Sequence, residues 1–186
     1  MGKEAYLVLN WNSVHLNAIK LAEAIKSSKE SFDYVIGVVR GGNVVASILS
    51  DLLNTDLIAI KLKAYKGTKL QGQAVLYDEP CVELRGKRIL VVDDVCDTGS
   101  TFKVLSSYLK LRGVDEMKFA VLVKKRTCDF NINYWSLEDD RWILFPWEIL
   151  EIYNQDPEGV KEAVREGMDN EVATRILGFI ESTGKT

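Results

Sequence analysis

The sequence has few of the residue types that build metal centres and disulfide frameworks. It contains one histidine, His15, and three cysteines, Cys81, Cys96 and Cys128. The cysteines are odd in number and widely spaced, and no two form a Cys-x-x-Cys motif, so the pattern indicates neither a zinc site nor a disulfide framework. A histidine without a second histidine to share a metal is more often structural than catalytic. A reducing cytosol is the simplest compartment for such a chain.

Long apolar runs and concentrated charge are also missing. No apolar run approaches the roughly 20 residues that a membrane-spanning helix needs, and residues 1–6 show neither a signal-peptide nor a myristoylation pattern. The formal net charge is −3 and there is no basic run, which argues against nonspecific nucleic-acid binding. We therefore expect a soluble, cytoplasmic protein that binds neither membranes nor nucleic acids.

What remains is the composition of a folded α/β protein. Hydrophobic residues make up 47% of the 186 residues, which supports a full core and fits one main domain better than two. Strand and helix patterns alternate, so we expect a mostly parallel sheet flanked by helices. The expected strands are 5–10, 34–39, 57–62, 89–92, 118–123 and one within 139–148, with a hairpin of 75–77 and 81–84; the expected helices are 14–25, capped by Asn12 or Ser13, 44–53 and 100–111.

The pattern changes after residue 150. Asp156 followed by Pro157 predicts the N-cap and first turn of a helix. Asp169 or Asn170 predicts the cap of a second helix. We expect residues 1–150 to form the main domain and residues 151–186 a C-terminal helical extension.

The strongest functional signal lies in residues 88–101. The apolar run 89–92 predicts a buried strand that leads directly into Asp93 and Asp94. Because uncompensated carboxylates are costly to bury, these side chains must meet cations, hydroxyls or solvent. The turn that follows, Asp97–Thr101, offers backbone N–H groups and hydroxyls at the start of a helix, which favours a phosphate. The stretch thus combines acceptors for sugar hydroxyls with donors for an anion.

A second loop has similar character. The strand 34–39 delivers Arg40, Gly41 and Gly42 to the start of an apolar helix. Two glycines between a strand and a helix can be no more than a tight turn. A second strand–glycine–helix loop in one small domain, led by an arginine, favours a second anion site.

These residues carry a family resemblance. Two acidic residues after a strand, a variable pair and then Asp-Thr-Gly-Ser-Thr resemble the phosphoribosyl pyrophosphate (PRPP) signature of type I phosphoribosyltransferases. The string from Trp142 to Glu148 resembles the base-binding hood of the xanthine-guanine and archaeal purine members. The resemblance covers about residues 13–150. It implies the type I phosphoribosyltransferase fold, an α/β fold with a central, mostly parallel sheet and a small hood over the active site.

The resemblance also implies roles for individual residues. Asp97 would accept the proton at the purine N7, and Val39–Arg40 would be a non-proline cis peptide bond. The lysine at position 124 would bond the 6-oxo group, since lysine carries only donors and would meet an amino group poorly. The implied site comprises Asp93 and Asp94 for the ribose and Mg²⁺; Asp97, Thr98, Gly99, Ser100 and Thr101 for the 5-phosphate; Arg40, Gly41, Gly42, Lys66 and Lys69 for pyrophosphate; and Lys124, Trp142 and Ile143 for the base.

The resemblance therefore implies an enzyme of purine salvage. It would transfer the 5-phosphoribosyl group of PRPP to hypoxanthine, guanine or xanthine, with Mg²⁺, and would act as a homodimer or higher homo-oligomer. The sequence does not rank these three bases. Two alternatives stay open: a phosphoribosyltransferase for adenine, uracil or orotate, and a non-catalytic regulator that senses PRPP or nucleotides. The regulator would need a nucleic-acid-binding surface, which the acidic chain does not offer.

Overall fold

A computed structural model describes residues 6–64, 74–76 and 81–183 of the chain. Contacts divide it into two compact units, one of residues 15–140 and one that joins residues 1–14 to residues 141–186. Each unit has its own hydrophobic core. Within the described ranges, no helix is long and apolar enough to cross a membrane.

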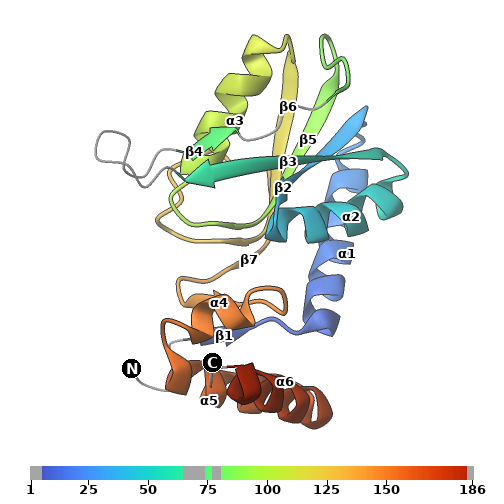
Figure 1. Ribbon diagram of the computed structural model, residues 1–186. Helices are drawn as coiled ribbons and strands as arrows, with labels where there is room; N and C mark the ends of the chain where they lie inside the picture. The colour runs from blue at the N-terminus through green and yellow to red at the C-terminus, as the bar shows by residue number, and fades with distance from the viewer. Residues whose placement is uncertain (1–5, 65–73, 77–80, 184–186) are drawn as a thin grey trace. The chain divides into compact units, whose positions relative to one another are not determined.

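The larger unit is built on a six-stranded sheet with the order β4-β3-β2-β5-β6-β7 (Figure 1). All neighbouring strands pair in parallel except β3 and β4, which are antiparallel. The elements are β2 (Tyr34–Val39), β3 (Asp56–Ala64), β4 (Ala74–Leu76), β5 (Arg88–Cys96), β6 (Glu116–Lys124) and β7 (Tyr134–Glu138), with helices α1 (Trp11–Ser27, most of which belongs to this unit), α2 (Gly41–Leu53) and α3 (Ser100–Leu111).

The strand order contains a switch point between β2 and β5. From β2 the chain passes through α2 to β3 on one side, whereas from β5 it passes through α3 to β6 on the other side. In open parallel sheets, ligands bind beyond the carboxyl ends of the strands at such a point. The fold therefore directs attention to the loops that follow β2 and β5.

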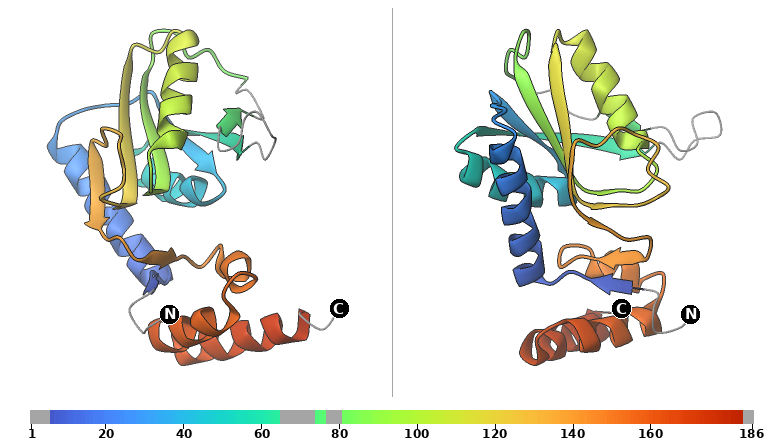
Figure 2. Two further views of the ribbon diagram at one scale, coloured as in Figure 1. Left: turned by 90° about the vertical axis from the view of Figure 1, so that its left-hand side faces the viewer. Right: turned by 180° about the vertical axis from the view of Figure 1, so that it is seen from behind.

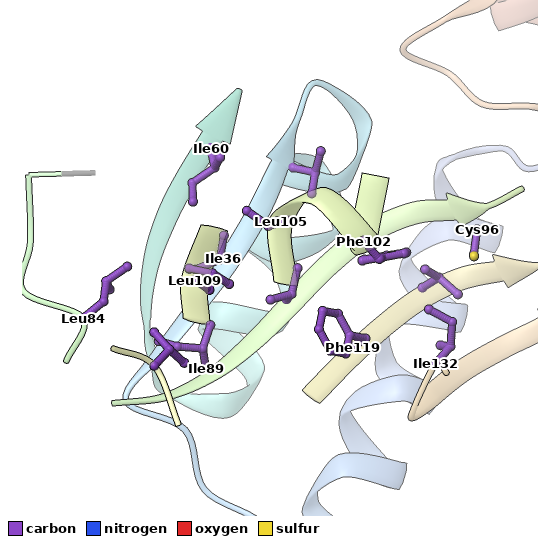
Figure 3. Close-up of a cluster of buried hydrophobic side chains, with 14 residues drawn as sticks. Ile36, Ile60, Leu84, Ile89, Cys96, Phe102, Leu105, Leu109, Phe119 and Ile132 are labelled. Atoms are coloured by element: carbon purple, nitrogen blue, oxygen red, sulfur yellow. The ribbon is translucent and has the colours of Figure 1, made fainter. Parts of the chain in front are cut away.

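Alternation along β5 explains why helices cover both faces of the sheet. Ile89 and Val91 are fully buried in one cluster with Phe102, Leu105 and Leu109, which form the apolar stripe of α3 (Figure 3). Leu90 and Val92, the alternate residues of β5, are equally buried but point to the opposite face. Figures 1 and 2 show α3 on one side of the sheet and α1 and α2 on the other.

A glycine lets α2 lie close to β2. A Cβ at Gly37 would come within 2.7 Å of the Ala46 Cβ and 2.8 Å of the Asn43 Cα. Any side chain at this position would therefore push α2 off the sheet. The close contact fixes the start of α2, and with it the loop that follows β2.

The smaller unit consists of a two-stranded parallel sheet and three helices. Its elements are β1 (Tyr6–Val8), β8 (Trp142–Leu144), α4 (Ile149–Tyr153), α5 (Pro157–Gly167) and α6 (Asn170–Thr183). The Tyr6 hydroxyl donates to the Asp156 carboxylate at 2.8 Å, and that carboxylate also caps α5 by accepting from the Gly159 N–H. Burial, aided by the hydrogen bond to Asp156, raises the pKa of Tyr6 to about 12. One carboxylate thus ties the first strand to the extension.

The structure confirms the α/β class, the mostly parallel sheet, the strand 34–39, the helix 100–111 and the Asp156 cap. Two predictions about the secondary structure were wrong. Residues 81–84 form no strand, and β4 pairs with β3 instead. The cap of α1 is Asn10, whose Oδ1 accepts from the Ser13 N–H at 2.9 Å, rather than Asn12 or Ser13.

Candidate active site

Three loops meet the carboxyl ends of neighbouring strands in the larger unit. They follow β2, β5 and β6, which are adjacent in the sheet and run in parallel. The register pairs Cys96 at the end of β5 with Lys124 at the end of β6. Side chains that are far apart in the sequence are therefore neighbours at this edge.

The two adjacent carboxylates lie in the last part of β5. The Asp94 N–H donates to Asp93 Oδ1 at 3.0 Å, and the Val95 N–H donates to Asp94 Oδ1 at 2.9 Å. Burial, and secondly the neighbouring Asp94 carboxylate, raise the pKa of Asp93 well above its ordinary range. A cation or hydroxyl donors placed here would stabilise the ionised form.

The loop after β2 reaches these carboxylates. A Cβ at Gly42 would lie 2.6 Å from Asp93 Oδ1 and 2.7 Å from the Asp93 Cα, so only glycine allows this approach. The predicted cis peptide bond is present at Val39–Arg40. Because α2 begins at Gly41, the loop lies at the positive end of a helix. The arrangement places anion-binding groups next to Asp93.

The turn after β5 encloses a cavity of about 300 Å³, which residues 93–102 line. Gly99 has a φ of +80°, a conformation that glycine adopts without strain, and α3 begins at the next residue. The Thr98 hydroxyl lies 3.2 Å from that of Ser100. Hydroxyls and N–H groups at a helix N-terminus suit an anion of phosphate size.

Lys124 lies at the end of β6, one strand from this turn. Its ammonium group is 4.4 Å from the ring centroid of Trp135, a cation–π contact that orients the lysine. Trp135 was not among the residues predicted from the sequence, because the strand that carries it, β7, was not predicted. The only sequence feature that pointed to Trp135 was a tryptophan among mixed polar and apolar residues after Lys124.

One prediction about the cysteines was wrong. Cys96 and Cys128 form a disulfide, with their Cα atoms 5.6 Å apart, and Cys81 is free and exposed. Cys96 and Cys128 are separated by 32 residues in the sequence. The parallel pairing of β5 and β6 and the turn that follows β6 bring the two cysteines together, and spacing along the chain does not reveal that pairing.

The structure brings most of the predicted site residues together in the larger unit: Arg40, Gly41, Gly42, Asp93, Asp94, Asp97, Thr98, Gly99, Ser100, Thr101 and Lys124. Trp142 and Ile143 belong to β8 of the smaller unit, where the former is 51% exposed and the latter is 4% exposed. Lys66 and Lys69 lie outside the described residues.

The acidic pair fits a shared magnesium ion. Among residues 6–64, 74–76 and 81–183, no group of three or more His, Cys, Asp or Glu side chains is arranged to hold a metal by itself. Mg²⁺ is commonly held by one or two carboxylates, with substrate phosphates and water as its other ligands. The donor chemistry of Asp93 and Asp94 meets that description.

Comparison with known proteins gives the family. Residues 8–150 match the phosphoribosyl transferase domain. The chain is 26% identical over 150 residues to a xanthine-guanine phosphoribosyltransferase from Gluconobacter oxydans, covering 80% of this chain and 88% of that one. A purine phosphoribosyltransferase structure from Pyrococcus horikoshii is 34% identical, with a TM-score of 0.70, over 77% of this chain and 93% of that one. A Neisseria gonorrhoeae protein with bound ppGpp is 26% identical, with a TM-score of 0.68, over 84% and 97%. The chain therefore belongs to the phosphoribosyl transferase family.

Proposed function

We propose that this enzyme transfers the 5-phosphoribosyl group of PRPP to a 6-oxopurine, namely hypoxanthine, guanine or xanthine, and releases pyrophosphate in purine salvage. The observation that carries the proposal is the joining of the acidic pair, the 97–101 turn and Lys124 at one sheet edge. Relatives named xanthine-guanine and hypoxanthine-guanine phosphoribosyltransferase support the choice of base.

The reaction makes demands that these residues can meet. As the bond from the ribose C1 to pyrophosphate breaks, positive charge grows on the ring and negative charge on the leaving group. Asp93 and Asp94 would accept hydrogen bonds from the ribose 2- and 3-hydroxyls and would hold Mg²⁺. When bound, Mg²⁺ would supply positive charge for the leaving pyrophosphate.

The N-termini of α3 and α2 would bind the 5-phosphate and the pyrophosphate group of PRPP, respectively. We place the 5-phosphate at the 97–101 turn, in the part of the cavity at the start of α3. Pyrophosphate would bind Arg40 and the backbone of Gly41 and Gly42 at the start of α2. Lys66 and Lys69, which lie outside the described residues, would add positive charge to this site.

The base would bind at the ends of β5 and β6. As the purine N9 bonds to the ribose C1, the proton on N7 would pass to the carboxylate of Asp97. Lys124 would donate to the 6-oxo oxygen, Trp142 would stack on the ring, and Ile143 would contribute backbone contacts.

We also propose the wider setting of this activity. Residues 1–150 would form the transferase domain including its hood, and residues 151–186 an extension. The enzyme would work in the cytoplasm as a homodimer or a higher homo-oligomer.

A pyrophosphate-release assay with Mg²⁺ and PRPP tests the proposal. The bases to compare are hypoxanthine, guanine, xanthine, adenine, uracil and orotate. Turnover should be dominated by one or more 6-oxopurines, at least about tenfold over adenine because the unmatched polar groups would penalise the wrong base. Lys124→Met should reduce this ratio, and Lys110→Met, on the exposed last turn of α3, is the matched control.

Two outcomes would overturn the assignment. Dominant turnover of a pyrimidine would reject the purine as the substrate. Tight binding of PRPP or a nucleotide without pyrophosphate release for any base would indicate a sensor instead of an enzyme.

A further inference from the structure

The segment 125–130, which follows β6, lies against the turn 97–101. A Cβ at Gly99 would come within 2.6 Å of the Phe130 Cβ and 3.2 Å of the Phe130 N, so the two segments pack closely. Two hydrogen bonds join the segment to the turn itself: Thr127 Oγ1 to Asp97 O at 2.9 Å and Asp129 N–H to Thr98 O at 3.3 Å. Residues that flank the turn add Lys125 N–H to Cys96 O at 3.0 Å, Lys103 Nζ to Asp129 Oδ2 at 3.0 Å, and the Cys96–Cys128 disulfide.

Thr127 is the member of this segment whose hydroxyl faces the Asp97 side chain. Its Oγ1 lies 2.9 Å from the Asp97 carbonyl oxygen and 3.2 Å from Asp97 Oδ1, so one hydroxyl can donate to either the backbone or the carboxylate of the same residue. The Lys125 Nζ is 3.7 Å from that Oδ1, which is an ion pair beyond hydrogen-bond distance. Thr127 therefore offers the directional contact.

The Asp97 carboxylate needs such a contact. Its side chain is 62% exposed, and an exposed aspartate changes rotamer on the picosecond to nanosecond timescale. A general base must stay within hydrogen-bond reach of the proton that it accepts. A misplacement of about 1 Å can cost roughly a hundredfold in rate.

We propose that Thr127 is a positioning residue that holds the Asp97 carboxylate in the orientation in which it accepts the purine N7 proton. The inference rests on the proposed function, because it takes Asp97 as the proton acceptor. Thr127 acts through Asp97 and contributes to turnover without contributing to the affinity for PRPP or base.

The segment does not depend on the Thr127 hydroxyl for its fold. The disulfide at Cys128 and the hydrogen bonds from the Lys125 and Asp129 N–H groups anchor it to β5 and the turn. The Arg126 N–H donates to Asp140 Oδ1 at 2.9 Å and fixes its far side. Removing one hydroxyl should therefore loosen Asp97 and leave the segment in place.

A matched pair of substitutions tests the role. Thr127→Val keeps the shape and removes the hydroxyl, whereas Thr127→Ser keeps the hydroxyl. We expect T127V to lower kcat about tenfold, with KM for PRPP and base within about twofold of the wild type, because orientation in the transition state is lost and ground-state binding is not. T127S should recover kcat to within about threefold, and both variants should melt near the wild-type temperature.

Three kinetic results would overturn the inference: a wild-type kcat in T127V, a kcat in T127S as low as that in T127V, or a rise in KM for PRPP with kcat unchanged. Three-bond NMR couplings that report the χ1 rotamer of Asp97 in the ligand-free protein separate this failure from that of the proposed function. T127V should show averaging of the Asp97 side chain among rotamers, and T127S should show the couplings of the wild type. If the wild type releases no pyrophosphate with any base, the proposed function fails, and unchanged couplings in T127V would by themselves reject the positioning role.

Discussion

The ligand-free protein stabilises the ionised form of Asp93 poorly. Burial and the Asp94 carboxylate both oppose its ionisation, and its pKa is raised well above the ordinary range. Sites that bind charged substrates commonly retain such groups at a cost in stability. In the proposed reaction, the ribose hydroxyls and Mg²⁺ would supply the compensation that the fold omits.

Asp93→Asn should therefore stabilise the ligand-free protein. A carboxyl whose folded pKa exceeds its unfolded pKa binds its proton more tightly when folded, so wild-type stability should fall as pH rises from about 4 through the folded pKa. The D93N variant should not lose stability in this way as the pH rises. Its free energy of unfolding should exceed that of the wild type most clearly at neutral pH. Urea unfolding between pH 4 and 8, without Mg²⁺ or PRPP, measures both curves. Asp115→Asn, on an exposed carboxylate, is the control, and parallel curves for D93N and the wild type would contradict the argument.

Gly42 is the second residue whose identity the site dictates. Gly42→Ala would place a Cβ 2.6 Å from Asp93 Oδ1 and 2.7 Å from the Asp93 Cα. Because the second contact is with backbone, relief requires movement of α2 or β5, and we expect a loss of about 1–3 kcal/mol in the free energy of unfolding. Gly178→Ala is the matched control, since a Cβ there meets nothing within 4 Å and alanine favours a helix by about 1 kcal/mol. Equal unfolding midpoints for the two variants would show that the loop is less closely packed than the distances indicate.

At the scale of elements, the sequence predicted what depends on local pattern. The strand 34–39 and the helix 100–111 carry their signals in consecutive residues, and so do the acidic pair and the 97–101 turn. β7 was missed because its five residues are partly buried or exposed without a regular alternation, and it becomes a strand through its pairing with β6. Trp135 contacts Lys124 from the neighbouring strand, and Thr127 contacts Asp97 from the loop that follows β6. Contacts of this kind depend on which strands are neighbours, and no spacing along the chain encodes that.

The Cys96–Cys128 disulfide also joins residues that are far apart in the sequence. We expect the protein purified without reductant to titrate one thiol per denatured chain, that of Cys81, and three after reduction. Reduction should lower the free energy of unfolding by about 4 kcal/mol, because a disulfide closing a loop of this length restricts the unfolded chain. Thermal unfolding with and without reductant measures the loss.

Two variants make that comparison specific. The double variant C96S/C128S should melt like the reduced wild type and should not respond to reductant. Cys81→Ser should melt like the oxidised wild type. Three titratable thiols before reduction would show that the pair is open in solution, as is usual for cytosolic proteins.

At the scale of the whole molecule, the proposed chemistry is divided between the two units. The candidate PRPP-binding residues in the described ranges all belong to residues 15–140, whereas Trp142 and Ile143 belong to the other unit. The family match ends at residue 150, so α5 and α6 lie beyond it. Their apolar faces are buried in a cluster with Leu144 of β8, next to the candidate base-binding residues in the sequence. The extension is therefore part of the core that holds β8.

This division predicts separable effects on the two substrates. Trp142→Ala should raise KM for the purine about tenfold, because stacking of a base on an aromatic ring contributes about 1–3 kcal/mol and each 1.4 kcal/mol is tenfold in affinity. KM for PRPP should not change, since the residues assigned to PRPP lie in the other unit. Phe179→Ala, at a more exposed aromatic position of the same unit, is the control and should leave both constants unchanged. Steady-state kinetics with each substrate varied in turn measure both KM values. Equal increases in KM for the purine and for PRPP would mean that Trp142 supports the whole site. An unchanged KM for the purine would exclude Trp142 from the base-binding residues.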